Sequence, residues 1–112
     1  MKYIIPENKL DKIVFRYLDL NLKGLEKRKP KYYKGIVYGF PDEKYGVLRY
    51  ENNGTLYIYY RLIYKISEVF GLKESDSKLV ITKWVSDRFQ LKVINTWTII
   101  RPKSIRLAIE SN

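Results

Sequence analysis

A β-hairpin is predicted at residues 48–60, whose sequence is LRYENNGTLYIYY. The polar run at 52–54 separates two segments in which apolar and polar side chains alternate, which is the period expected of strands. A three-residue loop, with Gly54 in the left-handed conformation next to a bulge, pairs these strands so that their apolar residues share one face. That face consists of Leu48, Tyr50, Leu56, Ile58 and Tyr60.

Charge argues against the competing register, which has a two-residue turn. It pairs Tyr50 with Tyr57 and places Arg49 and Glu51 on the same face as Leu56, where charged groups would enter the core. We therefore expect the three-residue loop. The opposite face of the hairpin then carries Arg49, Tyr57 and Tyr59.

The rest of the chain predicts three helices and two further strands. The helices are expected from Pro6 to near Leu22, from Arg61 to Gly71, and from the capping run Ser75-Asp76-Ser77 through Phe89; the strands are expected at 35–40 and 91–100. This order predicts an α+β fold, a small and mainly antiparallel sheet of about three to four strands with about three helices packed on it. A chain of 112 residues suits one domain, 1–112. The alternating apolar residues of the tail at 101–112 favour an edge strand.

The strongest functional signal is a basic segment, residues 23–34, which holds six of the Lys and Arg side chains and one acid. Six minus one leaves +5, half of the formal net charge of +10. Because like charges at this density repel and resist burial, we expect an exposed loop that attracts polyanions. The phosphate-contacting candidates are Lys27, Arg28, Lys29, Lys31 and Lys34, and Tyr32 and Tyr33 are candidates for stacking on unpaired bases. The alternative is a solvated linker, rich in lysine because of AT-rich codon usage.

A second candidate site is the outer hairpin face. Tyr57 and Tyr59, spaced by two, would form a stacking platform, with Arg49 beside them for cation–π or phosphate contacts. The alternative is that these are ordinary strand residues covered by a helix, since tyrosine is favoured in strands.

Catalytic chemistry finds little support in the chain, which has no histidine and no cysteine. Imidazole bases, thiolate nucleophiles and Cys/His zinc sites are therefore excluded. Pro41-Asp42 matches the start of a nuclease metal motif, but the later acid Glu51 is followed by Asn52-Asn53 and has no lysine two residues after it, so a turn is expected at Pro41-Asp42. We predict no catalytic residue, no metal and no cofactor.

The two tryptophans, Trp84 and Trp97, are expected to be core anchors, because each falls on an apolar stripe. Asn95 interrupts the last predicted strand and indicates a bulge or an edge. No apolar stretch approaches the length of a membrane span, and the N-terminus lacks the apolar region of a signal peptide. We expect a protein that acts inside a cell or in a virus.

Three stretches resemble small uncharacterised proteins encoded by AT-rich bacteriophages. They are the opening residues 1–5 leading into a helix, the Leu56-Tyr57-Ile58 strand leading into a helix that ends at Phe70-Gly71-Leu72, and residues 74–77 followed by 84–91. The resemblance implies a phage setting, in the host cytoplasm or the virion. It implies no functional residue, and the basic segment lies outside it.

Together these observations predict a non-catalytic phage accessory protein that contacts nucleic acid or a nucleoprotein surface through the basic segment. The alternative is a protein-interaction or virion assembly component, in which the same segment docks an acidic protein, the tail at 101–112 adds a strand to a partner, and self-association or virion-protein association is open. No membrane and no small-molecule substrate is expected as a partner.

Overall fold

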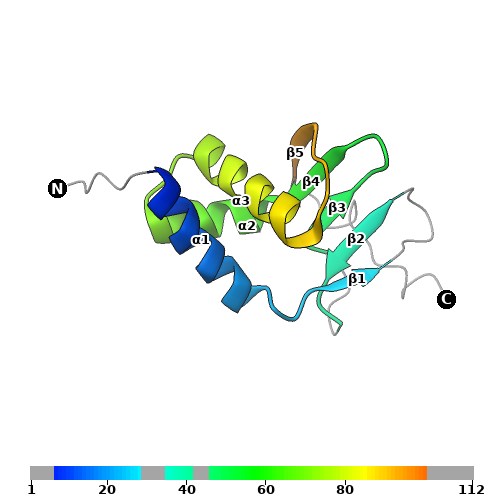
Figure 1. Ribbon diagram of the computed structural model, residues 1–112, viewed down its shortest axis with the longest axis horizontal. Helices are drawn as coiled ribbons and strands as arrows, with labels where there is room; N and C mark the ends of the chain where they lie inside the picture. The colour runs from blue at the N-terminus through cyan, green and yellow to red at the C-terminus, as the bar shows by residue number, and fades with distance from the viewer. Residues whose placement is uncertain (1–6, 29–34, 42–45, 101–112) are drawn as a thin grey trace.

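The computed structural model describes residues 7–28, 35–41 and 46–100. In these ranges the chain forms three helices and one sheet of five strands (Figure 1). In order, the elements are α1 (Glu7–Asn21), β1 (Glu26–Arg28), β2 (Ile36–Gly39), β3 (Leu48–Tyr50), β4 (Thr55–Tyr59), α2 (Tyr60–Phe70), α3 (Glu74–Phe89) and β5 (Asn95–Ile99). The α+β class is confirmed. The expected strand number was too low, and both the start of the first helix at Pro6 and the tail at 101–112 lie outside the described residues.

The sheet has the order β1-β2-β3-β4-β5, which is the order of the chain. The first four strands pair antiparallel, as expected, whereas β5 pairs parallel with β4. A parallel neighbour needs a long crossover connection, and α2 and α3 together supply it. This crossover brings residues 55–59 beside residues 95–99.

The hairpin of β3 and β4 adopts the expected register. Leu48 lies opposite Ile58, and Tyr50 lies opposite Leu56. Gly54 has a positive φ of 90°, which side chains other than that of glycine tolerate poorly. The three-residue loop is therefore confirmed. Tyr60, expected as the last residue of the apolar strand face, instead begins α2.

The core lies between one face of this sheet and the helices, which gather on one side of the sheet (Figure 1). Leu48, Leu56 and Ile58 from the sheet are fully buried, because the helices cover this face. The helices contribute their apolar stripes, which are Val14 and Leu18 of α1, Ile63 and Ile66 of α2, and Val80, Ile81, Trp84 and Val85 of α3. Trp84 is a core anchor, as expected, and its Nε1 donates a hydrogen bond of 2.9 Å to Oδ1 of Asp19.

The end of α2 agrees with the sequence prediction, whereas the start of α3 differs from it. Gly71 ends α2 in the left-handed conformation, as expected. In contrast, α3 begins at Glu74 after Lys73, so neither Ser75 nor Ser77 caps it. Ser77 is buried instead, and its Oγ lies 2.7 Å from Oγ of Ser67 in α2. A hydroxyl that could have capped the helix therefore joins the two helices of the crossover.

Candidate nucleic-acid interface

A row of positions, hereafter the outer row, crosses the sheet from β1 to β5. The strand registers place Arg28 opposite Val37, Val37 opposite Arg49, Arg49 opposite Tyr57, and Tyr57 beside Trp97. Paired positions on neighbouring strands share a face, and this is the face that the helices do not cover. With a strand spacing of about 4.8 Å, the row measures roughly 19 Å.

Arg49 and Tyr57 are in contact at the centre of the outer row. The Cζ atom of Arg49 lies 4.2 Å from the centre of the Tyr57 ring, within the range of a cation–π interaction. The Arg49 guanidinium also lies 3.8 Å from a carboxylate oxygen of Glu51, and its side chain is 13% exposed. Arg49 therefore orients Tyr57 and is poorly placed for a phosphate contact as the sheet stands.

The expected stacking pair, Tyr57 and Tyr59, lies on the outer face as the register requires. Both side chains are half-buried and pack against buried Val37 and Ile99, a second and smaller apolar cluster. Tyr59 also meets Tyr60 edge to face, with ring centres 5.3 Å apart. These rings are thus held in place, with part of each surface still accessible.

Trp97 is the accessible aromatic residue at the β5 end of the row, and its side chain is 59% exposed. The expectation that Trp97 is a core anchor is wrong. Its alternation with Ile99 is real, but the parallel register with β4 turns this set to the outer face. The residues on the helix side of β5 are Thr96 and Thr98, and no pattern within 95–99 alone distinguishes the two faces.

The basic segment joins the sheet at the opposite end of the outer row. Lys23 and Lys27 are exposed, and Glu26–Arg28 forms the edge strand β1 and not part of a loop as expected. This correction has a backbone cause, because β1 gains its hydrogen bonds from β2, and charged side chains suit an edge strand. Lys29, Lys31, Tyr32, Tyr33 and Lys34 lie outside the described residues.

The structure does describe the residues on either side of 29–34. Arg28 is the last residue of β1 and lies opposite Val37, and Gly35 directly precedes β2 and lies against the backbone of Tyr50. The end of β1 and the start of β2 therefore lie at the same end of the sheet as the 52–54 turn. Arg28 of the basic segment is therefore the β1 position of the outer row.

The described ranges contain no group of three or more His, Cys, Asp or Glu residues that could hold a metal ion. Within the same ranges, no helix is both long enough and apolar enough to cross a membrane. No protein-family model, curated protein or solved structure matches this chain.

Proposed function

We propose that this protein binds nucleic acid without catalysis, using the basic segment for phosphates and the β5 end of the outer row for bases. The observation that carries the proposal is the outer row itself. It has an exposed indole in register with an oriented tyrosine at one end and Arg28 of the basic segment at the other. The sequence resemblance supports a phage setting, as an accessory protein in the host cytoplasm or the virion.

The two parts of the site would contribute differently. If about five cations of the segment meet phosphates of duplex DNA, the logarithm of the binding constant should fall with the logarithm of salt concentration with a slope near −4.5. Stacking on an aromatic side chain adds about 1 to 3 kcal/mol per base and requires unpaired bases. The protein should therefore prefer single strands at high salt, where the phosphate contribution is weak.

The charge contribution is tested by titrating labelled single-stranded and duplex oligonucleotides at several salt concentrations. Replacing Lys27, Arg28, Lys29 and Lys31 together by serine should flatten the slope by about 3 to 4 units. The matched control replaces four exposed lysines outside the basic segment, Lys9, Lys12, Lys65 and Lys73, by serine, which removes the same net charge from other surfaces. Equal slopes in the two variants would show that charge acts without a site.

The stacking contribution is tested by Trp97→Ala and by the pair Tyr32→Ala and Tyr33→Ala, which should weaken single-strand binding more than duplex binding. Tyr64→Ala is the control, because Tyr64 is an exposed aromatic residue on α2, outside the outer row. Failure of the unmodified protein to bind either nucleic acid at about 50 mM salt, where non-specific electrostatic binding is strong, would refute the proposal. Docking of the basic segment on an acidic protein would then be the better account.

A further inference from the structure

The two edges of the sheet differ in chemistry. One edge is β1, whose three residues Glu26–Arg28 are all charged. The other is β5, Asn95–Ile99, which carries no charge, and in the described part of the chain its far side pairs with no strand. Charged edge strands resist the addition of a further strand, whereas uncharged ones permit it. Among the strands that the structure describes, β5 is therefore the edge open to pairing.

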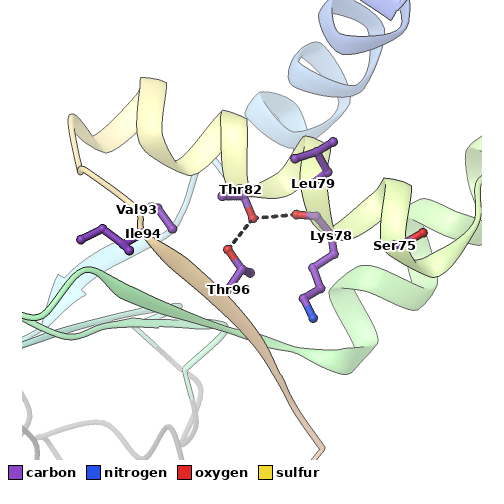
Figure 2. Close-up of a pocket in the computed structure, with 7 residues that line it drawn as sticks. All are labelled: Ser75, Lys78, Leu79, Thr82, Val93, Ile94 and Thr96. Carbon is purple, nitrogen blue, oxygen red and sulfur yellow. Dashed lines mark hydrogen bonds between the residues drawn. The ribbon is translucent and has the colours of Figure 1, made fainter.

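A groove accompanies this edge on the helix side, between α3 and β5 (Figure 2). Its volume is about 430 Å³, and its lining includes Lys78, Leu79, Thr82, Ile94 and Thr96. Thr82 Oγ1 donates a hydrogen bond of 2.7 Å to the carbonyl oxygen of Lys78 and lies 3.0 Å from Oγ1 of Thr96. Because the single Thr82 hydroxyl proton is used in the first bond, Thr96 donates the second. These bonds hold β5 against α3 and keep the groove open beside them.

Exposed apolar side chains gather around the same edge. Leu79 and Ile94 line the groove, and Trp97 and Ile100 lie exposed along β5 and just after it. These four residues are half of the large apolar side chains that are exposed in the described ranges. A strand added to β5 would place alternate side chains over the groove and beside Trp97, and so would cover apolar surface on both faces.

The positive charge near this edge favours an acidic segment over a second copy of the chain as the added strand. Lys78 is the charged residue among the described groove residues, and Figure 2 shows its side chain extending from α3 into the space beside β5. A second copy of the chain would bring another Lys78 and another formal charge of +10 toward the first, which disfavours self-pairing. An acidic segment suffers no such repulsion.

We propose that β5 accepts an extended segment of an acidic partner protein by strand addition, with acidic side chains on the Lys78 side and apolar side chains beside Trp97. Trp97 is shared with the proposed nucleic-acid site, but the groove residues lie outside the outer row, so Lys78→Glu tests strand addition separately from base stacking. It also differs from strand addition by the tail at 101–112, since the edge in question belongs to β5.

The test uses the full-length protein and a capped synthetic peptide of about six residues in which glutamate and valine alternate. The chain has two tryptophans, and Trp84 is already buried, so a change in tryptophan emission reports on Trp97. We expect the peptide to bind, the emission to shift to shorter wavelength as water leaves the indole, and Lys78→Glu to weaken binding by about tenfold. Lys65→Glu, on the exposed side of α2, is the control with the same charge change and should bind as the unmodified protein does.

The grouped isomer of the peptide, with all glutamates before all valines, has the same charge and composition without the alternation. It should bind at least about tenfold more weakly, since only alternation matches the two faces of a strand. Equal binding of the two isomers, equal effects of Lys78→Glu and Lys65→Glu, or no peptide binding at all would overturn the proposal. Dimers of the protein alone that Trp97→Lys disrupts would also overturn it, because they would assign the edge to a second copy. Loss of nucleic-acid binding without loss of peptide binding would leave it standing.

Discussion

Two glycines lie just before strands of the sheet, and an added methyl group would have very different consequences at each. At Gly35, where φ is 116°, a Cβ atom would overlap the carbonyl oxygen of Tyr50 and lie 3.0 Å from Cα of Glu51. Both obstacles are backbone of β3 or its end, and they cannot move without disturbing the sheet. At Gly54, where φ is 90°, the nearest atoms would all belong to the exposed Ile94 side chain, with Cδ1 at 2.8 Å, Cγ1 at 2.9 Å and Cβ at 3.2 Å.

These contacts set the expected losses of stability. Gly71, with a φ of 64° and no atom within 4 Å of an added Cβ, gives the conformational cost alone, so Gly71→Ala should cost about 1 kcal/mol. Gly54→Ala should cost about 2 kcal/mol, because side-chain rotation moves Cγ1 and Cδ1 of Ile94 away and leaves only its Cβ atom close. Gly35→Ala should cost about 3 kcal/mol or more, because backbone must move as well. Against a typical total of about 5 to 15 kcal/mol, the last loss endangers folding.

The assay is chemical denaturation followed by circular dichroism, with Asn53→Ala as a control in the hairpin loop. That control removes a hydrogen bond of 3.0 Å from the Thr55 N–H to Oδ1 of Asn53, a loss of about 0.5 to 1.5 kcal/mol. A loss for Gly35→Ala no larger than that for Gly71→Ala would refute the close approach of β2 to β3. If Gly54→Val is no more destabilising than Asn53→Ala, the three-residue register is wrong, and the outward placement of Tyr57 and Tyr59 fails with it.

Three further outcomes are expected. Burial, with a smaller contribution from Tyr50, raises the pKa of the Tyr38 hydroxyl above its ordinary 10.0. The unfolded chain therefore loses this proton first, and the stability of the protein should fall as pH rises above 10. Tyr38→Phe should lessen that fall in thermal melts, and an unchanged pH profile of the melting temperature would contradict the reasoning. Ser77→Ala should lower the free energy of unfolding by about 1 to 3 kcal/mol, because it removes the hydrogen-bond partner of Ser67. The double variant with alanine at both positions should lose less than the sum of the two single losses, and strict additivity in denaturation would argue against the bond. Pure protein should not cleave labelled DNA or RNA in Mg²⁺ or Mn²⁺, and cleavage that Asp42→Ala abolishes would contradict a binding function.

Local sequence patterns predicted the structure correctly where a short stretch has regularly spaced apolar residues and ends at a glycine or a turn. The helical stripe ending at Gly71 and the alternation around the 52–54 turn predicted α2 and the register of β3 with β4. These patterns predicted nothing where the apolar residues have no regular spacing. The three residues of β1 are all charged, so nothing in their order predicts a strand, and their pairing with β2 became evident only in the structure. The caps expected for α3 failed because the helix already begins at Glu74, which places Ser77 inside its first turn, with its hydroxyl against that of Ser67.

The candidate sites divide in the same way. The sequence by itself determined the concentration of positive charge in residues 23–34, the absence of histidine and cysteine chemistry, and the shared face of Arg49, Tyr57 and Tyr59, because charge, composition and strand alternation are local properties. The exposure of Trp97, the uncharged β5 edge and the groove beside α3 were decided by tertiary structure alone. The physical reason is that alternation states which residues share a face but not which face is covered. Only the pairing of residues 55–59 with residues 95–99, brought together by two intervening helices, made that choice.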